Sequence, residues 1–276
     1  MKTLFTVLAT LVLSFSPFAR NALALEITFK SHAKLVKTLT LEELMKKAHV
    51  QSVKLIEPHE MISREYVGFS ANALFTAIYG PKWMKAEEVL FTCLDGYQPS
   101  IPVSRFLKYK GYLVFKRADS GRFRVTNKLQ DDEKIELGPL YLVWDNRHDA
   151  YLKMMGANDW PYQITSFDLI RFSDRFPKMA PSQGSKAAVK RGFVAFRQFC
   201  MTCHSINGEG GKKAMDLNFP KSVTQIHNDA WLRKWISNPT SLRPGTTMPA
   251  LNRALPNRAT TIHDIILYLK AMASQH

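Results

Sequence analysis

One short motif constrains this chain more than any other feature of its sequence. Residues Cys200-Met201-Thr202-Cys203-His204 read C-x-x-C-H. Two thiols three residues apart at the end of a helix can each add to one vinyl group of a haem, and the adjacent histidine then reaches the iron. The motif therefore predicts covalent haem attachment through Cys200 and Cys203, with His204 as an axial ligand of the iron.

Two other kinds of site use a similar pair of cysteines. A zinc site needs two further ligands at a compatible spacing, and the sequence has no cysteine after Cys93 other than this pair. A thioredoxin-like pair follows a strand in a βαβ unit, whereas the residues before Cys200 have a helical pattern. Both alternatives are therefore disfavoured.

A second axial ligand is expected from a thioether or another imidazole. Met248 lies 44 residues beyond His204, in a loop that reads Thr-Thr-Met-Pro-Ala. Met201 lies inside the motif and cannot reach the opposite face of the haem, and Met215 is too close to the histidine. We therefore expect Met248 to be the second ligand.

The first 24 residues have the pattern of a secretory signal peptide. A basic residue, Lys2, precedes a short apolar stretch, and Ala22-Leu23-Ala24 fits the small-x-small cleavage rule. The apolar stretch is shorter than the roughly 20 residues of a spanning helix, which disfavours an uncleaved anchor. Together with the haem motif, the pattern predicts export to the periplasm and no stable membrane insertion after cleavage.

The chain is strongly basic, with a formal net charge of +15. Such a balance suits nucleic acid, anionic lipid or an acidic protein. No nucleic-acid-binding signature is present, and redox encounters depend on electrostatic steering. The charge therefore predicts an acidic redox protein or a membrane oxidoreductase as the partner, and no binding of nucleic acid.

The pattern of the sequence changes at a polar, proline- and glycine-bearing stretch, which predicts a linker over 177–186. Before it, residues 25–176 alternate strand-like and helical pieces, typical of an α+β domain. After it, residues 187–276 have helical patterns joined by loops, which predicts an all-α domain. The expected strands are 27–30, 52–56, 89–93, 112–117, 140–144 and 163–172, and the expected helices are 41–47, 71–79, 187–199, 229–238 and 260–273.

Residues from about 187 to 274 resemble class I, single-haem cytochromes c. The resemblance is carried by the haem motif and by features around it, namely Gly192 and Phe196, the run 207–211, the segment 231–239, the Met248 loop and the final helix 265–269. It implies that the first and last helices cross at Gly192, Phe196 and Tyr268. Many relatives carry Gly-Pro-x-Leu where this chain reads Ala-Met-Asp-Leu at 214–217. The group that orients His204 is therefore open, and Pro220 is a nearby candidate.

The first domain carries short fragments that resemble molybdopterin-binding oxidoreductase domains of the sulfite-oxidase type. They lie at 40–44, 66–68, 95–97 with Pro102, and 138–144. The resemblance implies a fold more than an activity. A molybdenum centre would need a thiolate ligand, but Cys93 lies in an expected strand and is interpreted as a buried small hydrophobe. We therefore expect a degenerate, cofactor-free domain that docks a partner, with no molybdopterin.

The sequence thus favours a one-electron carrier with one haem c over an enzyme. One alternative is the haem-bearing electron-transfer part of a molybdenum-dependent oxidoreductase. Another is a haem sensor or peroxidase with an open sixth position. The ligation by Met248 decides between the carrier and this last alternative.

Overall fold

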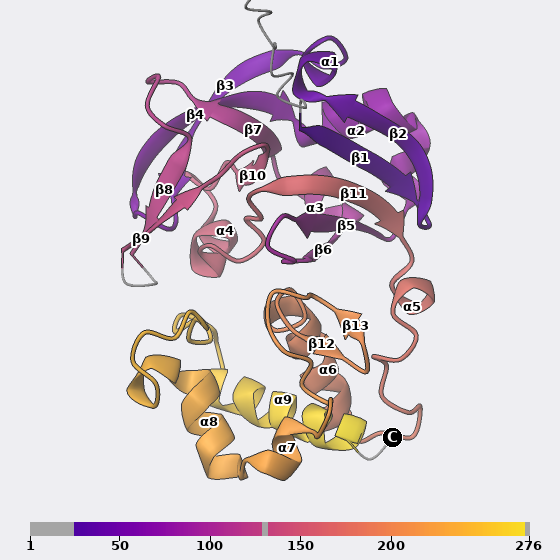
Figure 1. Ribbon diagram of the computed structural model, residues 1–276, viewed down its shortest axis with the longest axis vertical. Helices are drawn as coiled ribbons and strands as arrows, with labels where there is room; N and C mark the ends of the chain where they lie inside the picture. The colour runs from indigo at the N-terminus through magenta and orange to yellow at the C-terminus, as the bar shows by residue number, and fades with distance from the viewer. Residues whose placement is uncertain (1–24, 129–131, 274–276) are drawn as a thin grey trace, which may run out of the picture.

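The computed structural model describes residues 25–128 and 132–273 (Figure 1). The expected signal peptide at 1–24 lies outside the described residues. Over the described part the chain forms thirteen strands in four sheets and nine α-helices, with two 3-10 helices, η1 and η2. Within the same residues, none of the helices combines the length and the apolar character needed to cross a bilayer.

A five-stranded sheet forms one side of the N-terminal half. Its order is β2-β1-β11-β5-β6, in which β1 and β11 are parallel and the other neighbours are antiparallel. The strands are β1 (Glu26–Ser31), β2 (Lys34–Thr40), β5 (Glu88–Cys93), β6 (Ser100–Pro102) and β11 (Ile164–Ile170). The sheet thus joins the beginning of the chain to its middle.

A four-stranded antiparallel sheet, in the order β10-β7-β4-β3, completes the β-structure together with a separate hairpin. Its strands are β3 (Val50–Glu57), β4 (Ile62–Ser70), β7 (Gly111–Arg117) and β10 (Tyr141–Trp144), and the hairpin pairs β8 (Arg124–Asn127) with β9 (Glu133–Glu136). All six strands expected from β-branched and aromatic content are confirmed. The strands β2, β4, β6, β8 and β9 were not expected.

Aromatic side chains join the two large sheets through the helices between them. Phe75 contacts Phe167 of β11 with ring centroids 5.4 Å apart, and Phe106 contacts Trp144 of β10 at 5.0 Å. Phe75 and Phe106 lie 5.6 Å apart and close the chain of contacts. The helical elements of this half are α1 (Leu41–Met45), α2 (Ala71–Tyr79), η1 (Pro81–Lys85), α3 (Val103–Lys108) and α4 (Ala150–Met155). One apolar core therefore serves both sheets.

The C-terminal half is built around four helices and a short hairpin (Figure 1). A single helical turn, α5 (Phe172–Arg175), precedes the expected linker. The elements that follow are α6 (Ala187–Phe199), β12 (Ser205–Ile206), β13 (Glu209–Gly210), α7 (Val223–Ile226), α8 (Asp229–Ser237), η2 (Pro239–Ser241) and α9 (Arg258–Ala273). Helix α8 is capped at its N-terminus by Asn228, whose side chain accepts a hydrogen bond from the Trp231 amide at 2.9 Å.

The fold class expected from the sequence, an α+β domain followed by an all-α domain, is wrong. The described chain is mixed α/β, and one of its four sheets, β12-β13, lies in the half that was expected to be all-α. The physical reason is the Asn207-Gly208 turn, whose φ values of 55° and 80° suit a two-residue hairpin. This turn pairs Ser205 with Gly210 and Ile206 with Glu209.

Two apolar clusters divide the described residues. The first draws on residues between Ile27 and Leu169, and the second on residues between Ile170 and Met272 together with Leu90. Leu90 belongs to β5, so the second cluster reaches the outer face of the five-stranded sheet. Arg197 of α6 pairs there with Glu88, also on β5. The two halves are therefore in direct contact.

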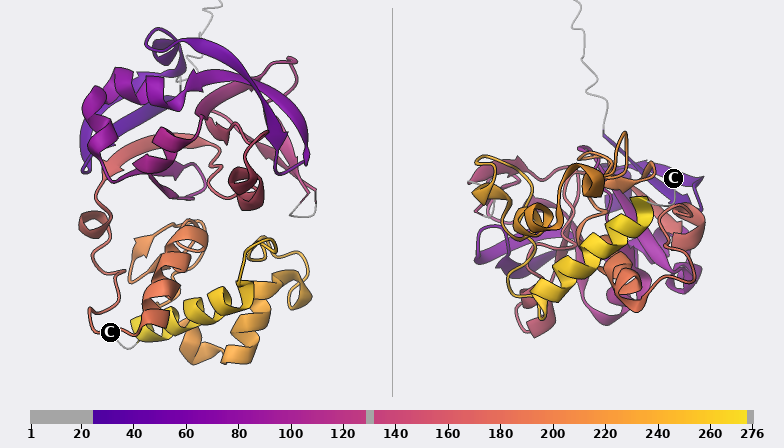
Figure 2. Two further views of the ribbon diagram at one scale, coloured as in Figure 1. Left: turned by 180° about the vertical axis from the view of Figure 1, so that it is seen from behind. Right: turned by 90° about the horizontal axis from the view of Figure 1, so that it is seen from below.

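Helices α6 and α9 cross (Figures 1 and 2), and Gly192 of α6 lies where they meet. A Cβ atom added at Gly192 would lie 1.9 Å from the Asp264 carbonyl oxygen and 2.9 Å from Cβ of Tyr268. Phe196, one turn later, contacts Tyr268 with ring centroids 5.1 Å apart. The expectation that Gly192, Phe196 and Tyr268 meet where these helices cross is confirmed.

Replacing Gly192 by alanine should therefore force the two helices apart. Overpacking of this kind costs about 1–3 kcal/mol, and it opposes the gain of about 1 kcal/mol that alanine brings to a helix interior. We expect Gly192→Ala to lower the free energy of unfolding, measured by denaturant titration.

The matched control is Gly184→Ala, at a site where an added Cβ meets nothing within 4 Å. This control should leave the free energy of unfolding nearly unchanged. Equal stability of the two variants would contradict the crossing as described.

Candidate functional site

The C-terminal end of α6 brings the two cysteines and the histidine of the motif into one tight turn. Cys200 is the C-cap, and its amide donates to the Phe196 carbonyl at 2.8 Å. The Cys200 carbonyl in turn accepts from the amides of Cys203, at 3.1 Å, and of His204, at 3.0 Å. The structure thus places three of the four expected site residues in a single turn.

Both thiols of this turn are free. Burial raises the pKa of Cys200 to about 12, with a further contribution from the neighbouring Cys203. Burial also raises the pKa of Cys203, although Thr202 and Lys213 oppose the change. A thioredoxin-like pair needs the opposite, a lowered thiol pKa. The environment therefore argues against that alternative.

The His204 ring is oriented by a backbone group. Its Nδ1 lies 2.9 Å from the Met215 carbonyl oxygen. A carbonyl accepts a hydrogen bond, so Nδ1 carries the proton and Nε2 keeps the lone pair that a metal would use. Burial lowers the pKa of His204 and favours the neutral ring, against the opposing effects of Met215 and Asp216. Pro220 is not the orienting group that the sequence suggested; Met215 is.

Two glycines let the chain wrap closely around the motif. A Cβ atom at Gly211 would lie 2.2 Å from the Thr202 carbonyl oxygen, and one at Gly210 would lie 2.6 Å from that of His204. The Gly211 amide donates to the Met201 carbonyl at 2.8 Å. Because no larger residue fits, these glycines bring the segment carrying Met215 back onto the histidine.

Met248, the fourth expected residue, lies on a different segment, the loop between η2 and α9. It is partly buried, and its amide lies 3.3 Å from Oγ1 of Thr246. The loop is anchored by the Leu251 amide, which donates to the Ile236 carbonyl of α8 at 3.0 Å. It is also held by Nδ2 of Asn252, which donates to the Met154 carbonyl of α4 at 2.7 Å. Both halves of the chain therefore position this loop.

The residues of the C-terminal half fit a covalently bound haem. Two free thiols stand next to a neutral imidazole whose Nε2 is available, and the partly buried Cys200 packs against the second apolar cluster. Within the residues that the structure describes, the motif included, no three side chains of His, Cys, Asp or Glu gather as a metal-ion site. The two thiols and the imidazole of the motif are the donors that a covalently attached haem would use.

The N-terminal half does not fit a molybdenum centre with a thiolate ligand. Cys93 is 4% exposed, and burial raises the pKa of its thiol well above the usual range. Its side chain belongs to the first apolar cluster. The interpretation of Cys93 as a buried small hydrophobe is confirmed.

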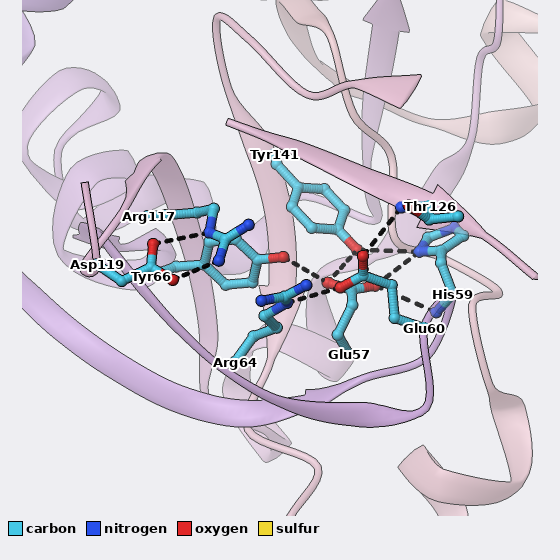
Figure 3. Close-up of polar contacts among 9 residues, drawn as sticks. All are labelled: Glu57, His59, Glu60, Arg64, Tyr66, Arg117, Asp119, Thr126 and Tyr141. Carbon is cyan, nitrogen blue, oxygen red and sulfur yellow. Dashed lines mark hydrogen bonds and ion pairs between the residues drawn. The ribbon is translucent and has the colours of Figure 1, made fainter. Parts of the chain in front are cut away.

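A second polar cluster lies inside the N-terminal half, around the fully buried Glu57 (Figure 3). This carboxylate accepts hydrogen bonds from the Tyr66 hydroxyl at 2.8 Å and from the Tyr141 hydroxyl at 3.1 Å. Its Oε1 also lies 2.7 Å from Nδ1 of His59. Burial, and then the charge of Glu57, raise the pKa of both tyrosines, so both remain donors. The cluster ties β3, β4 and β10 together.

A neighbouring ion pair extends this cluster towards the surface. Glu60 accepts from Nε of Arg64 at 2.6 Å and from the Thr126 amide of β8 at 3.0 Å (Figure 3). Burial raises the pKa of Glu60, but the bonds from Arg64 and Thr126 outweigh burial, and the net pKa is lowered. The Glu60 carboxylate thus holds the β8-β9 hairpin against the turn after β3.

His59, which follows a proline in a loop, was not predicted from the sequence to be a functional residue. The structure buries it to 5% exposure beside Glu57, two residues earlier, and Tyr141, far along the chain. The Glu-x-His spacing at 57–59 was the local signal that could have indicated the pair.

Comparison with protein-family models and with curated proteins gives no match for this chain.

The lowered pKa of Glu60 links this ion pair to pH. A carboxylate whose folded-state pKa is depressed stabilises the fold above its unfolded pKa, about 4.3, and this contribution is lost as pH falls through the folded value. We expect Glu60→Gln to lower the free energy of unfolding by about 1–3 kcal/mol near neutral pH. The difference from the parent protein should shrink as the pH falls from 5 to 3.

Urea titrations at several pH values measure this effect. The matched control is Glu26→Gln, because Glu26 is exposed at the start of β1. A Glu60→Gln deficit that stayed constant down to pH 3 would rule out the carboxylate charge as its source.

Proposed function

We propose that this chain is an exported c-type haem protein that transfers single electrons. Cys200 and Cys203 hold the haem covalently, and His204 and Met248 are the axial ligands of its iron. The single observation that carries the proposal is the hydrogen bond between His204 Nδ1 and the Met215 carbonyl, next to two free thiols. It leaves Nε2 with the lone pair that iron would use.

When bound, the haem supplies a reversible one-electron couple. The residues of the chain bind and orient it. The two thiols fix its position, and the Met215 carbonyl keeps the His204 ring in one tautomer and orientation. Thioether ligation by Met248 favours the reduced iron and raises the potential relative to other ligand choices. A filled sixth position suits electron transfer rather than chemistry on a substrate.

An exposed apolar surface beside the motif supports an acidic redox partner. Met215 and Phe219 are 56% and 71% exposed, although both are large hydrophobic residues. Phe219 lines a surface pocket of about 950 Å³, whose charged lining residues are Lys178, Lys212 and Asp216. An apolar centre with a basic rim is typical of a protein interaction site. Met215 also connects this surface to the haem ligand through its own carbonyl.

The first test is covalent haem and its spectrum, in protein matured in a periplasm that has haem-attachment machinery. We expect haem that survives denaturation, a low-spin reduced-minus-oxidised spectrum, and a weak near-infrared methionine band. Cys200→Ala with Cys203→Ala should abolish covalent attachment. Met248→Ala should abolish the near-infrared band and lower the potential.

Met84→Ala is the matched control, because Met84 is an exposed methionine of η1 in the N-terminal half. It should leave the spectrum unchanged. A parent protein without covalent haem overturns the proposal. A spectrum and potential that do not change in Met248→Ala would favour an open sixth position and a sensor or peroxidase.

A second test addresses the basic residues that line this surface pocket, Lys178 and Lys212. Reversing two charges with Lys178→Glu and Lys212→Glu should slow oxidation of the reduced protein by hexacyanoferrate(III), an anionic oxidant, roughly two- to tenfold at low ionic strength. The effect should fade as salt is added. Stopped-flow absorbance measures the rate.

The control for net charge is Lys34→Glu with Lys37→Glu, two reversals on the exposed strand β2 of the N-terminal half (Figure 1). With a cationic cobalt complex as oxidant, the Lys178→Glu and Lys212→Glu variant should react faster than the parent protein. Equal slowing by the β2 control would place the effect in the overall charge rather than in this surface.

A further inference from the structure

One turn of the N-terminal half is hydrogen-bonded directly to the haem-attachment motif. This turn, residues 93–98, connects β5 to β6. The Gln98 amide donates to the Thr202 carbonyl at 2.8 Å, between the two cysteines of the motif. The Lys212 amide donates back to the Gly96 carbonyl at 2.9 Å. Because both are backbone bonds, they fix the 93–98 turn against the motif whatever the side-chain rotamers.

The shape of the turn depends on Gly96. Its φ is +83°, and an added Cβ would lie 3.0 Å from the carbonyl carbon of Lys212. Within the turn, the Gly96 amide donates to the Cys93 carbonyl at 3.1 Å, and the Cys93 amide donates to the Tyr97 carbonyl at 3.0 Å. A left-handed residue without a side chain is what allows the two backbones to meet.

An ion pair crosses this contact. Nζ of Lys213 lies 2.7 Å from Oδ2 of Asp95, and both side chains are about one-third exposed, 34% and 28%. The amide of Ala214, the next residue, donates to the Cys203 carbonyl at 2.9 Å. Lys213 is thus held beside the second cysteine of the motif.

Tyr97 completes the contact. Gln98, the next residue, donates to the Thr202 carbonyl, and Oγ1 of Thr202 lies 3.9 Å from Sγ of Cys203. Lys213 lies over the rings of Tyr97, at 5.9 Å, and of Tyr162, at 5.7 Å. Residues of the N-terminal half therefore reach the atoms next to a haem-attaching sulfur.

We propose that the 93–98 turn is part of the haem site and that Asp95 and Lys213 shift the reduction potential of the haem in opposite directions. This inference rests on the proposed function. Reduction adds one negative charge to the haem. A nearby cation therefore stabilises the reduced state and raises the potential, whereas a nearby anion lowers it. The opposite charges of Asp95 and Lys213 largely cancel in their effect on the haem. Removing one residue therefore leaves the charge of the other uncompensated.

The test is the midpoint potential of two variants that each remove one charge. Asp95→Asn leaves Lys213 uncompensated and should shift the potential upwards. Asn keeps Oδ1, which accepts from the Tyr97 amide at 3.0 Å, so the turn is preserved. Lys213→Met leaves Asp95 uncompensated and should shift the potential downwards. The double variant should lie between the two, and added salt should shrink both shifts.

The matched control is Asp119→Asn, which removes one charge from the ion pair with Arg117 elsewhere in the N-terminal half. It should leave the potential unchanged. Circular dichroism and thermal unfolding of each variant check that the fold is retained. A purely structural role of the pair predicts shifts of the same sign, or none, in both single variants.

Failure of this inference is distinct from failure of the proposed function. Haem staining after denaturation shows whether the parent protein and each variant carry covalent haem before any potential is measured. Covalent haem with shifts of the same sign, or with no shift, overturns the role of Asp95 and Lys213. Absence of covalent haem from the parent protein overturns the proposed function instead.

Discussion

The close approach of α6 and α9 at Gly192 is the constraint on which the candidate site depends. The Asp264 carbonyl and Cβ of Tyr268 occupy the space that a side chain at this position would need. The approach fixes α6 against α9, and Cys200 caps the C-terminal end of α6 and begins the cysteine turn. It also buries Tyr268, whose hydroxyl donates to the Met179 carbonyl at 2.8 Å and holds the segment that leads into α6. One missing side chain thus fixes the position of the whole motif.

Local patterns predicted much of the secondary structure, but the fold class was wrong. The bounds of α2 and α6 follow directly from apolar spacing and from the residues that flank them. The β12-β13 hairpin was missed, although Asn207-Gly208 is the strongest short signal for such a turn, because the run was interpreted through a resemblance. The edge strands β2 and β6 carry weaker patterns, since one face of an edge strand need not be apolar.

Part of the candidate site could likewise be predicted from the sequence, and part could not. Cys200, Cys203 and His204 lie within one turn, and their spacing alone indicates their chemistry. The acceptor that orients His204 is a backbone carbonyl, which any residue could supply, so Met215 could not be identified from its side chain. Glu57 and Tyr141 meet through the pairing of distant strands, and that partnership depends on topology. Asp95 and Lys213 are 118 positions apart in sequence and meet through folding of both halves.

The backbone contact at Gly96 crosses the division of this chain into two halves. Chain order divides it near the polar stretch 177–186, and the two apolar clusters follow that division closely. The contacts around Cys200 and Cys203 do not follow this division, because Gly96 and Gln98 of the N-terminal half share backbone hydrogen bonds with the motif region. A graft of the C-terminal half onto another carrier would transfer the cysteines and His204 and leave Asp95 and Tyr97 behind. On the function that we propose, the haem-binding module is discontinuous, and its boundary lies inside the N-terminal half.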